Sequence, residues 1–216
     1  MKLFGFSAGG AGFTGNVDRM VKAVMDQAGT ENSFVKLTEK SYTPCRGCVT
    51  LCAKPQECML EDDLRPFYAA IPREAGGLVI GSPVYFEQVS AYLTGFLERF
   101  FAYRHVTARL KNLPVVAVLS HGVGRKDPME ALGRMLKALR LNLVDVVRFD
   151  SRIVPCLSCG RHTECRIGGL YHRLGEDART TDITPEMFHR WEDDPDAVAA
   201  VARAGESLSR AMAGTG

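Results

Sequence analysis

Residues 2–16 of the chain read KLFGFSAGGAGFTGN, and this stretch decides the fold. Its first part, Lys2–Ser7, is an apolar run that predicts a buried β-strand. The glycines that follow let the backbone turn tightly, and the next apolar residues recur on one face of a helix. These helical positions are Val17, Met20, Val21, Val24 and Met25. A strand, a glycine-rich turn and a helix in this order are typical of α/β proteins.

The alternation of strands and helices continues to about residue 150. Further strands are predicted at 33–37, 77–81, 114–119 and 144–149, and helices at 61–73, 88–103 and 127–139. The helix at 88–103 would turn Tyr92, Phe96, Leu97 and Phe100 inward. Continuous apolar strands such as Val115–Leu119 suit burial on both faces of a parallel sheet.

The fold class expected is therefore α/β, a flavodoxin-like, doubly wound sheet of five parallel strands in the order 2-1-3-4-5. Residues 1–150 would form this domain, including a cysteine-rich loop at 44–58. Residues 151–216 would form a cysteine-containing extension whose C-terminal helix packs on the same domain.

Composition narrows the class of protein. A chain of 216 residues with 46% hydrophobic and 24% charged residues suits one globular domain rather than two. The formal net charge is +2 and no basic stripe is evident, so nucleic acid is not suggested as a partner. No apolar run approaches the roughly 18 residues that span a bilayer, and the first apolar run breaks at once into glycines. We therefore expect a cytoplasmic protein with no membrane partner.

Three loops are predicted to meet at the carboxyl edge of the sheet, where open parallel sheets bind ligands. The first, Ser7–Val17, would bind a phosphate through N–H groups at a helix N-terminus. The second, Gly81–Phe86, offers a rigid proline and two aromatic rings to a flat apolar ring system. The third, 120–124, has glycines that allow a ligand to approach the backbone closely. If these segments bind no ligand, the first is only a tight turn, the second an ordinary strand-to-helix connection and the third a solvated loop.

The flat ligand that suits this edge is FMN, since one glycine-rich loop serves a single phosphate. The predicted FMN-binding residues are Ser7, Phe13, Thr14, Gly15, Asn16, Val17, Ser82, Pro83, Val84, Tyr85, Phe86, Ser120, His121, Gly122 and Gly124. An alternative remains, because Gly10–Gly15 also matches the dinucleotide pattern G-x-G-x-x-G and Glu39 lies near the end of the second strand. That alternative is a nicotinamide-binding protein without flavin. The two aromatic rings of the loop Gly81–Phe86 favour a flavin-binding protein instead.

Four cysteines lie within one short loop: Cys45, Cys48, Cys52 and Cys58. Thiolates bind iron–sulfur clusters and zinc, and this spacing lets one loop supply all four ligands. The loop follows the second strand, so it is expected at the flavin edge of the sheet, which favours a redox cluster over structural zinc. Reduced thiols or disulfides formed on oxidation are the alternative.

A second group of potential ligands recurs every third residue: Cys156, Cys159, His162 and Cys165. It would hold zinc or a second cluster, or else provide a thiol pair or a disulfide formed on oxidation. An odd total of seven cysteines in two tight groups suits a reducing compartment better than a disulfide framework.

Taken together, these motifs resemble the NADPH-dependent FMN reductase superfamily, and within it the iron–sulfur flavoproteins, over about residues 1–149. The most specific match is Gly81–Phe86, continuing through Val89-Ser90-Ala91 to Phe96–Arg99, since a similar family segment meets the isoalloxazine ring. Cys58–Asp63 also looks like the family's passage from a cysteine to two aspartates. The chain departs from the family where the first loop lacks an arginine and where three residues separate Cys48 from Cys52.

The resemblance implies an FMN-dependent oxidoreductase, linked to NAD(P)H, that passes electrons between FMN and a [4Fe–4S] cluster. It also implies a homodimer or higher homo-oligomer, with NAD(P)H or a redox partner protein as the electron donor. No acid–base dyad is evident, so no catalytic side chain is predicted. The alternative function is a non-enzymatic, flavodoxin-type electron carrier whose cysteine loop holds structural zinc or nothing.

Overall fold

The computed structural model describes residues 1–122 and 127–214. Within these ranges, five parallel strands form the sheet: β1 (Lys2–Ser7), β2 (Asn32–Lys36), β3 (Ala75–Tyr85), β5 (Pro114–His121) and β6 (Asn142–Asp150). Their order is β2-β1-β3-β5-β6, while the two-residue β4 (Gln88–Val89) pairs antiparallel with the end of β3. With β4 set aside, this is the predicted flavodoxin-like order 2-1-3-4-5, which is confirmed.

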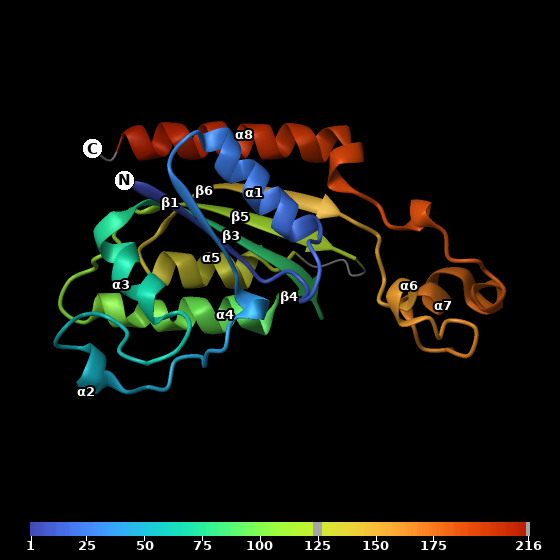
Figure 1. Cartoon of the computed structure of the whole chain (residues 1–216), viewed down its shortest axis with the longest axis horizontal. Coiled ribbons are helices and arrows are strands. Elements are labelled where there is room, and N and C mark those ends of the chain that lie inside the picture. Colours follow the sequence, from blue (N-terminus) through green and yellow to red (C-terminus); the bar gives the residue numbers. More distant parts are fainter. Residues whose placement is uncertain (123–126, 215–216) are drawn as a thin grey trace.

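Helices cover both faces of the sheet. Figure 1 shows α1 (Asn16–Ala28) and α8 (Pro195–Ala213) on one face, and α3 (Arg65–Glu74), α4 (Ala91–Glu98) and α5 (Met129–Ala138) on the other. Short helices are α2 (Val49–Cys52), α6 (Cys156–Cys159) and α7 (Gly169–Leu174), and 3₁₀ turns lie at Leu37–Glu39, Arg99–Arg104, Gly175–Arg179, Pro185–Met187 and Trp191–Asp193. Among the described residues, no helix combines the length and apolarity needed to cross a membrane.

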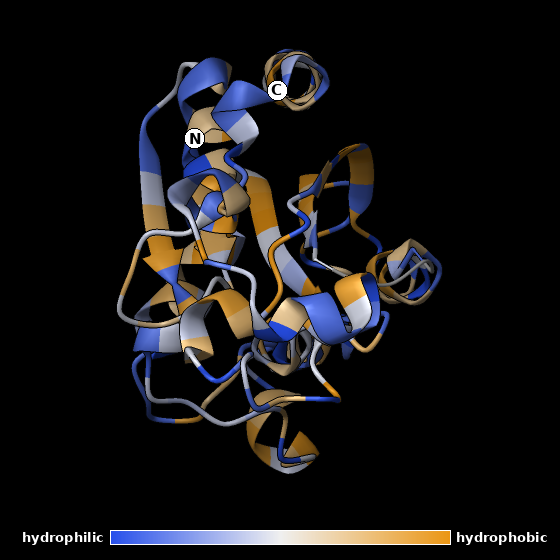
Figure 2. Ribbon diagram, turned by 90° about the vertical axis from the view of Figure 1, so that its right-hand side faces the viewer, coloured by the Kyte–Doolittle hydropathy of each residue, from blue (hydrophilic) through white to orange (hydrophobic). Residues whose placement is uncertain are grey.

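The hydrophobic core lies in two layers separated by the sheet. Every residue of Val115–Leu119 is fully buried, as expected for a parallel strand covered on both faces. The layer under α1 and α8 contains Met20 and Val21, and the layer under α3 to α5 contains Phe6 and Phe96. Figure 2 shows the apolar residues concentrated on the strands between the helical layers.

Two predicted helices differ in their boundaries. The acidic run 61–63 does not begin a helix, because Asp62 accepts the N–H of Leu64 and pairs with Arg99, so α3 begins only at Arg65. The helix predicted at 88–103 divides into β4, α4 and a 3₁₀ turn. Phe96, Leu97 and Phe100 are buried as predicted, whereas Tyr92 is 45% exposed, so its predicted inward position is wrong.

The chain leaves the sheet after β6 and returns only at α8. Between them it carries α6 and α7, which project beyond the end of the strands in Figure 1. This extension has its own small apolar cluster. The segment before α8 reaches the first loop, where the side-chain amide of Asn16 donates to the His189 carbonyl at 2.9 Å.

Candidate functional site

The ends of β1, β3 and β5 lie side by side at the carboxyl edge of the sheet. Ser7 is paired in register with Gly81, and Pro83 with Ser120. The N–H of Ala8 donates to the Gly81 carbonyl at 2.8 Å, which fixes the first loop against β3. The three segments predicted to share a ligand are therefore neighbours at one edge.

The glycine-rich loop offers unengaged backbone donors. Within the part of the chain that the structure describes, the N–H groups of Gly12 and Thr14 have no acceptor. The loop leads into the N-terminus of α1, whose first N–H groups also lack intrahelical partners. Gly12 adopts a φ of +80°, a conformation that favours glycine. This donor set fits a phosphate group.

A buried carboxylate organises the loop from below. Asp18 accepts a 2.5 Å hydrogen bond from the Ser7 hydroxyl and a 2.9 Å bond from the Gly15 N–H, and it pairs with Lys36 at 2.9 Å. Asp18 is 1% exposed and Lys36 is 9% exposed. Ser7 thus supports the loop rather than offering its proton to a ligand. Asp18 and Lys36 were not among the predicted site residues, although an acidic residue three positions after Gly15 is a helix-capping signal.

The other predicted members of the first loop divide between surface and core. Thr14 and Phe13 are exposed, and Val17 is buried in the core. Phe13 lies over the loop, since a Cβ on Gly10 or Gly15 would come within 3.0 and 3.2 Å of its ring. The carbonyl of the Asn16 side chain accepts from the Trp191 N–H at 3.2 Å, so this amide serves the segment before α8.

The second segment is not a loop, contrary to the prediction. Ser82–Tyr85 continue β3, and Phe86 and Glu87 form a two-residue hairpin turn with φ values of 51° and 61°. The Ser82 hydroxyl oxygen accepts the Ser90 N–H at 2.8 Å, which ties the hairpin to the start of α4. Val84 is buried, Tyr85 is 52% exposed and Phe86 is fully exposed, so the two rings are accessible.

The third segment begins within a strand. Ser120 and His121 are the last residues of β5, and the His121 carbonyl accepts from the Ser151 N–H and hydroxyl, both at 2.8 Å. A Cβ on Gly122 would come within 2.3 Å of the Ile153 carbonyl oxygen. The absence of a side chain at Gly122 therefore makes room for the backbone of Ile153. The predicted Gly124 lies outside the described residues.

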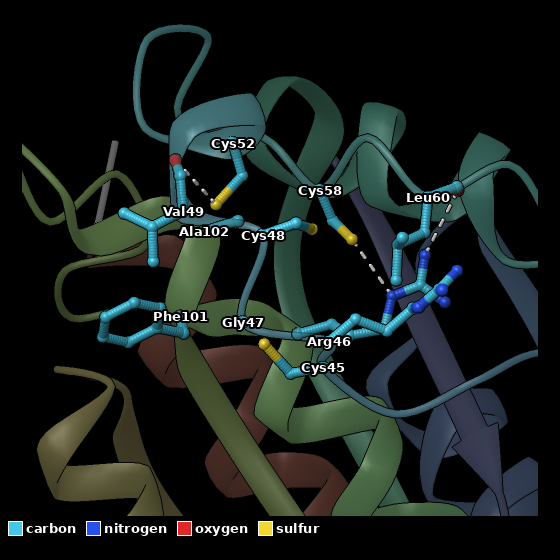
Figure 3. A pocket seen from close by; sticks show the side chains of 11 residues that line it. Cys45, Arg46, Gly47, Cys48, Val49, Cys52, Cys58, Leu60, Phe101 and Ala102 are labelled. Carbon is cyan, nitrogen blue, oxygen red and sulfur yellow. Dashed lines mark hydrogen bonds between the residues drawn. The ribbon is translucent and has the colours of Figure 1, made fainter.

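The first cysteine group surrounds one pocket. Cys45, Cys48, Cys52 and Cys58 all line it, together with apolar residues that include Val49, Leu60 and Phe101 (Figure 3). Cys52 and Cys58 are buried, Cys48 is half-buried and Cys45 is exposed, and the chain's seven cysteines are all free thiols. Four thiols around an apolar pocket are a donor set that fits an iron–sulfur cluster or zinc.

The sulfur atoms do not yet form a metal-binding arrangement. Across residues 1–122 and 127–214, no three cysteine, histidine, aspartate or glutamate side chains converge closely enough to hold a metal ion. The fit of this pocket to a metal group therefore rests on its donor atoms and on the residues that contact them.

Two nitrogen groups contact these sulfurs. Arg99, whose side chain is fully buried, donates from Nε to Cys58 Sγ at 3.1 Å and pairs with Asp62 at 2.6 Å. His105 Nε2 lies 3.1 Å from Cys52 Sγ. Burial, and then the neighbouring Cys48 thiol, raise the pKa of the Cys52 thiol. Neither Arg99 nor His105 was predicted to have a role, although a charged residue among the apolar residues of 93–103 is a sign of a buried pair.

The first cysteine group does not lie at the carboxyl edge, so the predicted placement beside the flavin is wrong. After β2 the chain runs back along α4, where a Cβ on Gly95 would contact Pro44 at 3.3 Å. Arg109, just before β5, donates to the Gln56 carbonyl at 2.9 Å. Figure 1 accordingly shows α2 and the β3–β4 hairpin at opposite ends of α4.

The second cysteine group is separate from the first. Cys156 and Cys159 bound α6, and His162 and Cys165 follow before α7, in the extension beyond β6 (Figure 1). Cys156 is buried, Cys165 is half-buried and Cys159 is exposed.

Known proteins share both the fold and parts of the sequence. An iron–sulfur flavoprotein of Methanocaldococcus jannaschii is 34% identical over 46% of this chain and 51% of its own length. An iron–sulfur flavoprotein of Archaeoglobus fulgidus is 30% identical over 58% of this chain and 57% of its own length. The chain thus spans about half the length of the curated relatives it matches.

An oxidoreductase of Corynebacterium diphtheriae superposes with a TM-score of 0.54 at 15% identity, over 99% of this chain and 97% of that one, which shows a shared fold. The family model described as NADPH-dependent FMN reductase matches residues 1–151, from the start of the chain to just past the end of β6. The chain therefore belongs to the NADPH-dependent FMN reductase family.

Proposed function

We propose that this protein is an FMN-dependent oxidoreductase that takes electrons from NAD(P)H or a redox partner protein and exchanges them with an iron–sulfur cluster held by Cys45, Cys48, Cys52 and Cys58. The observation that carries the proposal is the gathering of four free thiols around one pocket in a member of this family. The two relatives described above are named iron–sulfur flavoproteins, which supports the same assignment.

The proposed FMN site is the carboxyl edge of the sheet. The free N–H groups of Gly12 and Thr14 would hold the phosphate, while Tyr85 and Phe86 would lie against the flat ring. Bound FMN would accept a hydride and release its electrons singly. The protein's own task there is to hold and orient the ring, and Asp18 and Lys36 keep the phosphate loop in place.

The proposed cluster site is held to the core by Arg99. When bound, the cluster would carry single electrons. The N–H group of Arg99 would then donate to the Cys58 thiolate, and His105 would contact that of Cys52. Hydrogen bonds to cluster sulfurs raise the reduction potential, because they favour the more negative reduced state. The exposed Cys45 leaves one side of the pocket open to a redox partner.

The length of α4 separates the two proposed sites within one chain. Direct exchange between them would therefore cross the core of the molecule or involve another chain, in line with the homo-oligomer that we also propose. Seven free thiols suit a reducing compartment, and we place the protein in the cytoplasm on that ground.

Anaerobic purification tests this function directly. We expect FMN on extraction and chromatography, stoichiometric iron and sulfide, flavin bands above broad cluster absorption, and steady-state oxidation of NAD(P)H. Cys48→Ala should lose the iron but keep FMN, whereas Thr50→Ala, an exposed neighbour in the same loop, should keep both.

Three results would contradict the proposal in distinguishable ways. Colourless protein after reconstitution with FMN would favour the nicotinamide-binding alternative. Zinc in place of iron at the first group, without NAD(P)H oxidation, would favour a flavodoxin-type carrier. Iron unchanged in Cys48→Ala would place the cluster outside this pocket.

A further inference from the structure

The extension after β6 has only a small apolar core of its own. Its buried apolar cluster consists of Val154, Cys156, Leu157, Leu170 and Ala178. Segments with so little buried apolar area usually depend on a disulfide or a structural metal. All three cysteines of the extension are free thiols. The extension therefore lacks a covalent cross-link where its core is weakest.

Two sulfurs of the second cysteine group face the same position. A Cβ on Gly168 would lie 2.5 Å from Cys156 Sγ and 3.1 Å from Cys165 Sγ. A side chain at position 168 would displace Cys156 Sγ, so the glycine leaves both sulfurs in their present positions. The Leu170 N–H also donates to Cys156 Sγ at 3.4 Å, an interaction that suits a thiolate. The chain thus brings two thiols, nine residues apart, to one small space lined by a backbone donor.

A histidine nitrogen in the same group is buried and has no partner within residues 1–122 and 127–214. His162 Nε2 lies 2.9 Å from the Thr181 carbonyl, which only accepts, so Nε2 must carry the proton. In the neutral ring, Nδ1 then carries a lone pair, yet this buried atom has no partner among the described residues. Histidines that bind metals are commonly oriented in this way, with the other ring nitrogen donating to a carbonyl.

We propose that Cys156, Cys159, His162 and Cys165 bind one structural Zn²⁺ ion. Three thiolates and one imidazole are a ligand set of tetrahedral structural zinc sites, whereas iron–sulfur clusters are mostly held by thiolates alone. Gly160, with a φ of +69°, reverses the chain between the first two ligands and the last two. On binding, the three thiols release three protons and no electron is transferred.

Closing the site requires local side-chain movement. No three of the four side chains converge in the described structure, so both Cys159 and His162 must move toward the other two ligands. Cys159 Sγ now lies 3.6 Å from the Cys156 carbonyl. The thiolates would give the zinc site a net negative charge. Arg179, which is ion-paired with Glu176, donates to the Thr163 carbonyl at 3.0 Å and so holds the backbone between the last two ligands.

The ion would brace the extension against the sheet. Arg173 of α7 donates to the Gly122 carbonyl at 2.6 Å, next to the end of β5. A zinc ion linking α6 to the start of α7 would hold Arg173 in that position. The proposal stands independently of flavin binding and of the first cysteine group.

Metal analysis of the full-length protein tests the site. We expect about one zinc per chain in the native protein, in Ser158→Ala and in Cys48→Ala, which disables only the first group. Cys159→Ser and His162→Ala should bind zinc more than about a hundredfold more weakly, as measured by competition with a chelator. Ser158 is an exposed neighbour of Cys159 and serves as the matched control.

A second measurement leaves the second cysteine group intact and does not depend on how its variants fold. Cys48→Ala protein stripped of zinc and titrated with Co²⁺ should develop the visible bands of a tetrahedral site with thiolate ligands, and zinc should abolish them. Three results would overturn the proposal: Cys48→Ala protein free of zinc with no such cobalt bands, iron and sulfide at the second group, or a disulfide between Cys156 and Cys165 in anaerobic protein.

Discussion

Arg99 Nε donates a 3.1 Å hydrogen bond to the sulfur of Cys58, and both side chains are buried. The same guanidinium pairs with Asp62 at 2.6 Å and lies 4.3 Å from the centre of the Tyr68 ring. The planar fork of arginine can serve a sulfur and a carboxylate at once, which an ammonium group cannot do with the same geometry. Arg99 thereby joins the cysteine pocket to the core beneath α3 and α4.

Removing Arg99 should destabilise the protein. Arg99→Met leaves Asp62 without its buried partner, so we expect the free energy of unfolding in urea to fall by about 3–5 kcal/mol. Arg104→Met, at an exposed position five residues along, should change it by less than about 0.5 kcal/mol. Similar losses in the two variants would mean that the Arg99 ion pair contributes nothing of its own.

Replacing Arg99 by lysine separates charge from hydrogen bonding. Arg99→Lys keeps a cation near Asp62 but loses the geometry of the bond to Cys58. In cluster-loaded protein we expect a lower reduction potential than in the native protein, because a bond that favours the reduced cluster is gone. Anaerobic redox titration measures this. An unchanged potential with an intact cluster would show that Arg99 acts on the fold alone.

Asp18 should matter for both stability and flavin binding. Asp18→Ala removes the buried partner of Lys36, which then keeps only the exposed Glu39, 3.8 Å away, as an ionic partner. It also frees Ser7 and the Gly15 N–H, so we expect a loss of about 3–5 kcal/mol in unfolding free energy. FMN affinity should fall as the loop loses its support. Asp26→Ala, on the exposed face of α1, is the control and should leave FMN affinity unchanged. Urea denaturation and flavin fluorescence titration provide the two readouts.

Tyr85 should contribute to flavin affinity through its ring. Tyr85→Ala is expected to weaken FMN binding several-fold, since an aromatic contact contributes about 0.5–1.5 kcal/mol beyond burial. Phe101→Ala removes a ring of similar exposure, 45% against 52%, in the 3₁₀ turn after α4. Fluorescence titration should therefore find native affinity for Phe101→Ala. Equal affinities for the two variants would remove Tyr85 from the flavin site.

The hairpin turn holds an unfavourable backbone conformation at Phe86. Its φ of 51° disfavours an aromatic residue, whereas asparagine tolerates it, and the Phe86 ring makes no buried contact to lose. We expect Phe86→Asn to raise the unfolding free energy of flavin-free protein by about 1 kcal/mol. Val106→Asn, which replaces an exposed residue at ordinary φ, should not raise it. A destabilised Phe86→Asn protein would contradict this account.

Local pattern alone predicted much of the fold. Lys2–Ser7 was placed to the residue, and the buried face of α1 was predicted from Val17 to Met25, because strand and helix periodicities are carried by neighbouring residues. The parallel order followed from the alternation of these elements. The spacing of the cysteines along the chain likewise indicated two separate groups.

Only the tertiary structure decided where those groups lie and what contacts them. Residues 37–58 have no regular period, so nothing in the sequence revealed that this segment runs back along α4 and away from the flavin edge. The pairs Asp18–Lys36 and Arg99–Cys58 join residues 18 and 41 positions apart. The proton position on the His162 ring depends on a carbonyl 19 residues away, and Nδ1 has no partner among the residues that the structure describes. Local sequence determines periodicity and turn chemistry, whereas such contacts depend on the path of the intervening chain, which only the packed molecule determines.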